Sequence, residues 1–146
     1  MPVKILLVNG PNLNTLGMRE PELYGHETLP QIEARCYEAA KRLGLTLDCV
    51  QSNHEGEIVT VIQGAGATYQ GMIINAAAFT HTSIAIMDAL LLLKIPVIEV
   101  HLSNIFKREE FRHHSYISAA AKGMICGLGG TGYVLALEAL AELCGA

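Results

Sequence analysis

The chain has 146 residues, which is the length of about one domain on the usual scale of roughly 100 to 200 residues. Hydrophobic residues make up 51% of it and charged residues 16%, against a typical ~25% charged, and the mean hydropathy is +0.33. Such a composition indicates either a membrane span or a large surface buried against other copies of the chain. The longest apolar stretch, residues 84–98, is interrupted by Asp88, Lys94 and Pro96 and falls short of the roughly 18 residues that a spanning helix needs, which excludes a span.

The net charge and the cysteines indicate which partners the protein can bind and in which compartment it is located. The net charge is −4 and no basic run is present, which argues against binding to nucleic acid. The beginning of the sequence shows no secretory signal, and the four cysteines lie far apart without a C-x-x-C pair. We therefore expect a single catalytic domain over residues 1–146 with buried thiols, located in the cytoplasm.

The first elements in chain order have clear local signals. Val3–Asn9 is an apolar run that stops at Gly10 and Pro11, which predicts a buried strand. A long polar loop follows. Thr28 and Gln31 have the spacing of a capping box, with Pro30 in the first turn, which predicts a helix that runs up to Gly44.

The later elements alternate regularly. Strands are predicted over 45–51, 72–75, 96–100 and 124–126, and helices over 55–63, 83–93, 115–121 and 131–143. Short apolar strands that alternate with helices predict a parallel sheet covered on both faces. The expected fold is a flavodoxin-like, doubly wound, five-stranded α/β structure, a three-layer αβα sandwich with strand order 2-1-3-4-5.

Ligands of such a sheet bind beyond the carboxyl ends of the strands, so the loops that follow the strands are the place to look. These loops cover residues 9–25, 51–56, 75–83, 99–112 and 127–132. They hold nearly all the amides, most of the histidines and the candidate substrate-binding arginines of an otherwise apolar chain. This concentration predicts an active site on one rim.

Several of these residues have a structural reading beside the functional one. Ser83 and Asn75 could cap helices, and His101 could be a core histidine. Glu99, two residues before His101 on the same face of a strand, could instead fix its tautomer and make it an acid or base. Tyr24 could be a packing residue, but Arg19 in the same loop could lower the pKa of its phenol.

Other chemistries lack their sequence patterns. The glycine-rich Gly127–Gly132 stretch follows the last strand and is read as a tight helix start that could cradle an anion. G-x-S-x-G is absent, the adjacent His113 and His114 point apart rather than forming a zinc site, and the lysines avoid the strand ends. What remains is a site without metal or cofactor, suited to a lyase or isomerase of small hydroxy acids. A flavin carrier and a non-catalytic binding module are the alternatives.

The loop motifs together resemble the type II 3-dehydroquinate dehydratase family. The match runs in order along essentially the whole chain. The motifs are Gly10-Pro11-Asn12-Leu13-Asn14, Leu16-Gly17, Arg19-Glu20-Pro21, Tyr24-Gly25, Gln51-Ser52-Asn53, Glu55-Gly56, Thr80-His81-Thr82-Ser83, Glu99-Val100-His101-Leu102-Ser103-Asn104, Arg108-Glu109 and Phe111-Arg112. Two positions depart from the family pattern, with Ala76 in place of a proline and Met87 in place of an arginine.

The resemblance implies anti elimination of water from 3-dehydroquinate to 3-dehydroshikimate through an enolate. It makes Tyr24 the base, Arg19 the group that lowers its pKa, and Asn12 a holder of the water that stabilises the enolate. It makes His101 the acid, oriented by Glu99. The implied substrate contacts are Asn75, His81, the backbone of Leu102 and Ser103 for the carboxylate, and Arg112 for a ring hydroxyl.

The resemblance also implies an assembly. The family forms dodecamers built of trimers, in which Asp88 would reach a neighbouring subunit's site, and Arg108 is a further candidate for loop closure. The apolar surplus would then be surface hidden between subunits.

Overall fold

The sheet has the predicted strand order. The computed structural model describes residues 2–18 and 20–146, with the backbone but not the side chains of Leu23 and Tyr24. Within that part of the chain, five parallel strands pair in the order β2-β1-β3-β4-β5. Their bounds are β1 Val3–Asn9, β2 Leu45–Gln51, β3 Gly71–Asn75, β4 Val97–His101 and β5 Gly123–Cys126.

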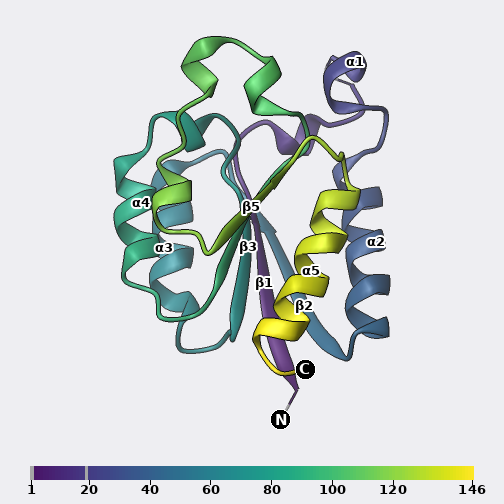
Figure 1. Cartoon of the computed structure of the whole chain (residues 1–146), viewed down its shortest axis with the longest axis vertical. Coiled ribbons are helices and arrows are strands. Elements are labelled where there is room, and N and C mark those ends of the chain that lie inside the picture. The colour runs from purple at the N-terminus through teal and green to yellow at the C-terminus, as the bar shows by residue number, and fades with distance from the viewer. Residues whose placement is uncertain (1, 19) are drawn as a thin grey trace.

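Helices cover both faces of this sheet. They are α1 Pro21–Tyr24, α2 Leu29–Arg42, α3 Glu55–Ala65, α4 Ile84–Leu91 and α5 Thr131–Leu143. Figure 1 shows α2 and α5 on one side and α3 and α4 on the other. Both chain ends lie at the bottom of the view, and the loops that follow the carboxyl ends of the strands lie at the top. None of the helices in the described residues has the length and apolar character that a membrane span requires.

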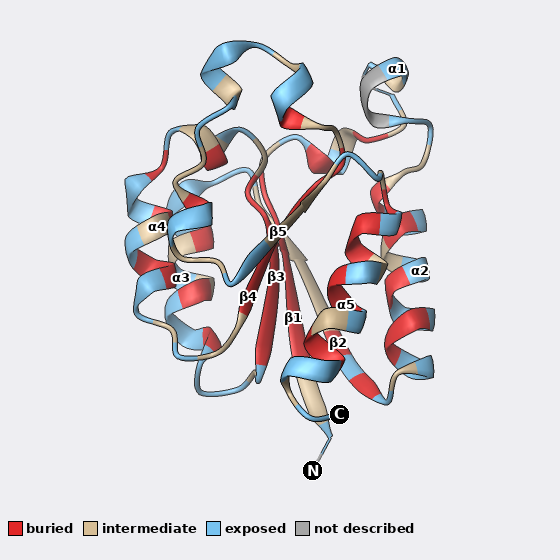
Figure 2. Cartoon of the chain, viewed as in Figure 1, coloured by how far each residue is buried: buried red, intermediate tan, exposed pale blue. Residues whose placement is uncertain are grey.

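The central strand β1 shows why the layers form. Its side chains alternate, so Ile5 and Leu7 pack into the core under α2 and α5 while Leu6 and Val8 pack under α3 and α4. All four are buried, as the red strands of Figure 2 show. A parallel strand that is apolar on both faces needs cover on both faces, and the sequence read as a continuous apolar run for this reason.

The predicted capping box of α2 is present. The Thr28 backbone N–H donates to Gln31 Oε1 at 2.9 Å, and the Gln31 N–H donates back to Thr28 Oγ1 at 3.3 Å. Gly44 follows the helix with a φ of +74°, a conformation that glycine adopts without strain. Both ends of this helix therefore lie where their local signals placed them, to within a residue or two.

The helix predicted over residues 115–121 is wrong, because this segment forms only a 3₁₀ turn over Ile117–Ala119. Ser115 and Ser118 explain the difference. Their hydroxyls donate to the buried Glu99 carboxylate, and Ser115 Oγ also accepts the Ser118 backbone N–H at 3.0 Å. Serine side chains that bond in this way compete with a regular helix.

Short elements also occupy loops for which no helix was predicted. They are the 3₁₀ turns Leu13–Thr15, Ala77–His81, Ile105–Lys107 and Glu110–Arg112, together with α1. Strand β4 begins one residue later than predicted and extends through His101, while α4 ends at Leu91 rather than Leu93. This shift of β4 by one residue brings His101 into the sheet.

The expectation of four buried thiols is only partly right. Cys36 on α2 is buried, but Cys49, Cys126 and Cys144 are half-buried. Cys49 and Cys126 lie on β2 and β5, the two edge strands, which have a neighbouring strand on one side only. All four are free thiols.

Candidate active site

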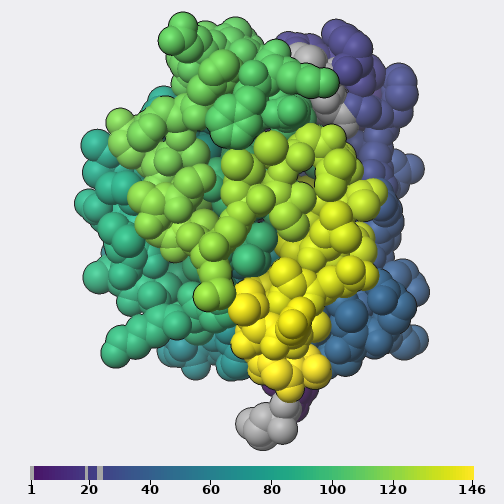
Figure 3. All heavy atoms as spheres, viewed as in Figure 1, coloured from purple at the N-terminus to yellow at the C-terminus, as the bar shows by residue number. Residues whose placement is uncertain are grey.

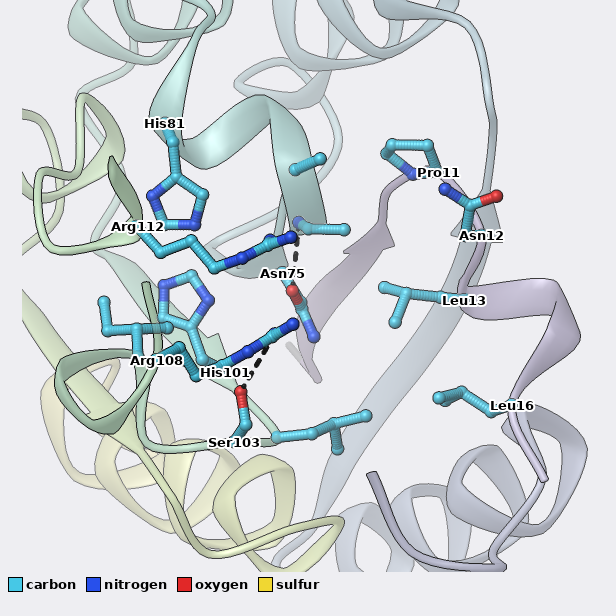
Figure 4. A pocket seen from close by; sticks show the side chains of 14 residues that line it. Pro11, Asn12, Leu13, Leu16, Asn75, His81, His101, Ser103, Arg108 and Arg112 are labelled. Atoms are coloured by element: carbon cyan, nitrogen blue, oxygen red, sulfur yellow. Dashed lines mark hydrogen bonds between the residues drawn. The ribbon is translucent and has the colours of Figure 1, made fainter. Parts of the chain in front are cut away.

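One pocket lies at the carboxyl end of the sheet, where the loops after β1, β3 and β4 meet (Figure 4). Its lining residues are Pro11, Asn12, Leu13, Leu16, Asn75, Ala77, Ala78, His81, His101, Leu102, Ser103, Ile105, Arg108 and Arg112. In the space-filling view the segment after β4, in green, covers the top of the molecule above α5, in yellow (Figure 3). Residues far apart in the sequence are therefore brought together by the sheet.

The predicted pair of Glu99 and His101 lies at the base of this site. The two residues alternate along β4, and His101 Nε2 is 2.5 Å from Glu99 Oε2. Glu99 is 0% exposed and His101 5% exposed, so the pair is shielded from solvent. Because the histidine also lines the pocket, it is both a buried residue and one that a ligand can contact.

Three donors hold the Glu99 carboxylate. His101 and Ser115 donate to Oε2, the latter at 2.7 Å, and Ser118 donates to Oε1. Burial raises the pKa of this carboxyl, but the hydrogen bonds from His101, Ser118 and Ser115 together outweigh it and hold the pKa below its ordinary value. Glu99 is therefore an anion at neutral pH and accepts a hydrogen bond from the His101 ring.

His81 lies beside His101 and lines the same pocket. The rings stack with centroids 6.3 Å apart, and His81 Nδ1 lies 2.9 Å from the His114 carbonyl oxygen. Burial lowers the pKa of His81, and the hydrogen bond to that carbonyl opposes it only in part. A carbonyl can only accept, so Nδ1 carries the proton and Nε2 presents a lone pair.

Asn75 ends β3 and bonds in two directions. Its Oδ1 accepts the Ala77 backbone N–H at 3.1 Å, and its Nδ2 donates to the Tyr133 hydroxyl at 2.9 Å. Ser83, the other residue with a possible capping role, accepts the Ile86 N–H at 2.9 Å and caps α4. Asn75 therefore stabilises the turn after β3 that lines the pocket, whereas Ser83 only caps α4.

Asn12 is held in a left-handed conformation, with φ +69°, by amides from a neighbouring loop. Its backbone N–H donates to Asn53 Oδ1 at 2.9 Å. Gln51 Nε2 donates to the Gly10 carbonyl at 3.1 Å and to Asn53 Oδ1 at 3.1 Å. The amides of Gln51 and Asn53, at the end of β2, therefore do not line the pocket but hold the loop that does.

The departure at Ala76 leaves this turn compatible with the family pattern. Ala76 has φ −77°, a value that proline also adopts. Ala76 is buried, and a Cβ added to Gly10 would lie only 2.5 Å from its carbonyl oxygen. The loops after β1 and β3 are thus in direct backbone contact.

Two arginines of the segment after β4, Arg108 and Arg112, line the pocket. Arg108 Nη1 lies 3.5 Å from Ser103 Oγ, and Arg112 Nε donates to Glu109 Oε2 at 3.3 Å. Both arginines line the pocket in Figure 4. Two guanidinium groups beside neutral amides suit a ligand that carries an anion and several hydroxyls.

The glycine-rich stretch supports this segment from behind. The Gly127 N–H donates to the His101 carbonyl at 3.3 Å, and the Gly129 N–H donates to the Leu102 carbonyl at 3.0 Å. A Cβ at Gly130 would meet Glu27 Oε1 at 2.6 Å and Arg35 Nη1 at 2.9 Å. The stretch therefore packs closely against the catalytic strand end and does not line the pocket.

Glu27 and Arg35, which lie close to Gly130, also hold the end of the loop that carries Tyr24. Arg35 Nη1 donates to Glu27 Oε1 at 2.9 Å, and Arg35 Nη2 donates to Thr131 Oγ1 at 3.0 Å. This cluster ties the end of the loop to α2 and α5. The loop is thus held at its start by amides and at its end by an ion pair.

Four of the predicted site residues are not among those that line the pocket, and one of them, Glu99, contacts it only through His101. Arg19 and the Tyr24 side chain lie outside the described residues, although the Tyr24 backbone ends α1. Asp88 is exposed on α4 and is not among the lining residues. His113 and His114 are exposed and have separate partners, the Arg108 carbonyl and the Tyr116 ring, and no group of metal-ligating side chains is found in the described part of the chain.

Sequence reasoning missed the residues that lie behind the pocket. Ser115 and Ser118 contact Glu99, and Tyr133 and Asn9 stand behind Asn75. The spacing of the two serines resembled a helix, and Tyr133 lies in an apolar run that reads as core. Of these residues only Asn9 had a sequence signal for a place behind the site, because it is an amide at the end of an apolar strand.

Comparison with known proteins gives a consistent result. The family model for class II dehydroquinase matches residues 3–141. A 3-dehydroquinate dehydratase of Prochlorococcus marinus subsp. pastoris is 56% identical over 140 residues, 96% of each chain, and one of Rhizobium meliloti is 55% identical over 143 residues, 98% of this chain and 97% of that protein. The crystal structure of the type II dehydroquinase from Propionibacterium acnes superposes with a TM-score of 0.94 at 48% identity, covering 97% of this chain and 98% of that one.

Proposed function

Because this chain belongs to the class II dehydroquinase family, we propose that it eliminates water from 3-dehydroquinate to give 3-dehydroshikimate, a step of the shikimate pathway. Relatives that match over nearly their whole length carry the name of this activity. The observation in the molecule that carries the proposal is the buried Glu99–His101 pair facing a pocket of amides and arginines. It supplies a proton donor beside groups that bind a polyhydroxylated anion.

The first step is removal of the proton on the carbon next to the ketone. The Tyr24 phenolate takes this proton, and the electrons of the C–H bond move to the ketone oxygen to form an enolate. Arg19 lowers the pKa of the phenol so that the phenolate is populated near neutral pH, and Asn12 holds the water that stabilises the enolate. These three residues share the loop between β1 and α2, which is braced at both ends.

The second step expels the hydroxyl group. The enolate electrons reform the carbonyl and make the carbon–carbon double bond while the C–O bond breaks, and the oxygen leaves as water with a proton from His101. Glu99 accepts a hydrogen bond from His101 Nε2 and so fixes the ring, and the proton given to the departing hydroxyl is therefore the one on the other ring nitrogen, Nδ1. The pair needs no metal to perform this step, since the leaving group receives a full proton.

The remaining residues bind the substrate. The backbone of Leu102 and Ser103 receives the carboxylate, and Arg112 receives a ring hydroxyl. Asn75 and His81 contact further hydroxyls, Asn75 as a donor through Nδ2 and His81 through the lone pair on Nε2. Arg108, which lines the same pocket, closes the site over the bound anion.

We also propose a dodecamer built of trimers, in which Asp88 reaches the site of a neighbouring subunit. Exposed apolar side chains at the two ends of α4 support a subunit contact, because Ile84 and Leu91 on the helix and Leu92 directly after it are 52%, 57% and 71% exposed. The free thiols are in keeping with a cytoplasmic location. Sedimentation velocity at micromolar concentration should show a large assembly, and a monomer would contradict this proposal.

The activity is tested by adding 3-dehydroquinate to the purified protein and following the ultraviolet absorbance of the conjugated enone product. The protein is first treated with a chelator and, in a parallel sample, with borohydride in the presence of substrate. We expect the absorbance to rise at the same rate in all samples, because neither a metal nor a lysine imine takes part. The absence of any rise in the untreated protein would refute the proposed function.

A further inference from the structure

Tyr133 is a fully buried phenol that the proposed mechanism does not use. It is the third residue of α5 and is 0% exposed. Its hydroxyl donates to Asn9 Oδ1 at 2.6 Å and accepts from Asn75 Nδ2 at 2.9 Å. Asn9 and Asn75 are paired residues at the carboxyl ends of β1 and β3, so one phenol joins the two central strand ends.

The Ala77 backbone N–H determines which group donates and which accepts in each of these hydrogen bonds. The Ala77 N–H can only donate, so the Asn75 atom that faces it must be the carbonyl oxygen. The amide nitrogen of Asn75 then faces Tyr133, whose oxygen must accept and whose proton must point to Asn9. Each orientation in the chain is thereby determined.

The Asn9 side chain indicates that this arrangement matters. Its amide nitrogen is buried and has no hydrogen-bond partner in the described part of the chain. A buried donor without a partner is unfavourable, and a leucine of similar size would avoid it. The bond that Asn9 does make, to the Tyr133 hydroxyl, is therefore the reason for an asparagine here.

We infer that Tyr133 is a positioning residue that fixes the Asn75 amide so that one N–H points at a hydroxyl oxygen of the substrate. This inference rests on the proposed function, in which Asn75 contacts the substrate. The nitrogen has two hydrogens, and Tyr133 is its one acceptor recorded among the described residues. The second hydrogen therefore serves the pocket, which Asn75 lines (Figure 4).

The same contact supports the shape of the pocket. Ala77 has φ +52°, a left-handed conformation that is strained for alanine, and its N–H bonds to the oxygen of the amide that Tyr133 holds. Burial raises the pKa of the Tyr133 phenol, so the hydroxyl stays protonated throughout the working range of the enzyme. The positioning is thus independent of pH.

Tyr133→Phe tests the inference because it keeps the ring and removes only the hydroxyl. We expect KM for 3-dehydroquinate to rise about tenfold and kcat to change by less than about threefold, since a freed amide loses binding in the ground state and transition state alike. The KM ratio should be constant from about pH 6 to pH 9, because the hydroxyl it replaces does not titrate there. Tyr69→Phe is the matched control, since its phenol bonds to Asp48 at 2.7 Å outside the pocket and KM should not change.

A double-mutant cycle shows whether Tyr133 acts through Asn75. In an Asn75→Ala background, adding Tyr133→Phe should change kcat/KM by less than about twofold, because the group it positions is gone. An equal loss in both backgrounds, or an unchanged KM in Tyr133→Phe, overturns the inference.

Asn9→Leu gives a second route if Tyr133→Phe does not fold. It removes the acceptor of the phenolic proton, and we expect KM to rise about threefold or more because the hydroxyl can then turn away from its position. An unchanged KM in this variant also overturns the inference. Failure of the proposed function is distinct from both outcomes, because the wild-type protein would then produce no enone at all.

Discussion

Gly10 lies where the loops after β1 and β3 touch, and Gly10→Ala tests whether this contact sets the geometry of the site. The Gly10 N–H donates to the Asn75 carbonyl at 2.8 Å. A Cβ at this position would lie 2.5 Å from the Ala76 carbonyl oxygen and 2.7 Å from its carbonyl carbon. Both are backbone atoms, so no side chain can rotate to make room.

The size of the effect follows from these distances. An ordinary contact begins at 3.4 Å, so the two loops must separate by about 0.9 Å, the difference between 3.4 Å and 2.5 Å. Overpacking of this kind costs about 1–3 kcal/mol of stability. A displacement of about 1 Å between catalytic groups lowers the rate about 100-fold, and Asn12 and Asn75 lie on the two loops that separate.

The assay is kcat/KM from enone absorbance, beside a thermal melt. We expect Gly10→Ala to fold, with a lower melting temperature, and to lose about 100-fold in kcat/KM. Gly64→Ala on the exposed face of α3 is the control, since nothing lies within 4 Å of its Cβ and alanine should stabilise the helix by about 0.5–1 kcal/mol. Near-normal kcat/KM in Gly10→Ala would show that the loop contact does not set the active-site geometry.

Two further predictions concern the base and the buried carboxylate. Tyr24→Phe should abolish turnover while substrate still binds in a calorimetric titration, and a near-normal kcat would refute its role as base. Ser115→Ala with Ser118→Ala removes two donors to the Glu99 anion and should cost about 3 kcal/mol in urea unfolding at pH 7. The lowered pKa of Glu99 stabilises the fold at pH values above the ordinary carboxyl pKa of 4.5, and this stabilisation is lost as the pH falls below it through the folded-state pKa. The difference in unfolding free energy between wild type and variant should therefore shrink as the pH is lowered from 7 to below 4.5. A difference that stays constant over this range would show that the serines do not act on the charged form.

The fold was predictable because its signals are local. The apolar runs of β1 and β3, the capping box at Thr28 and the alternation of strands with helices are each visible within a few residues. They predict the parallel sheet, and a parallel sheet predicts the rim on which the pocket lies. Glu99 and His101 were predictable as a pair because alternate residues of one strand share a face.

The parts that sequence reasoning missed depend on long-range contacts. Tyr133 bonds to Asn9, 124 residues away, and nothing near it in the apolar helix reveals a polar partner. Ser115 and Ser118 form a turn rather than a helix because Glu99, on another element, takes their hydroxyls. Such residues support the site from behind, and only the folded chain shows what they contact.

The central claim is that His101, held by Glu99, donates the proton to the departing hydroxyl after a separate base has formed the enolate. The most direct test is His101→Ala incubated with 3-dehydroquinate in deuterated water and followed by proton NMR. We predict that enone formation is lost while the hydrogen next to the ketone still exchanges with solvent, because enolate formation does not need His101. An enone signal at the wild-type rate, with exchange also retained, would contradict the account.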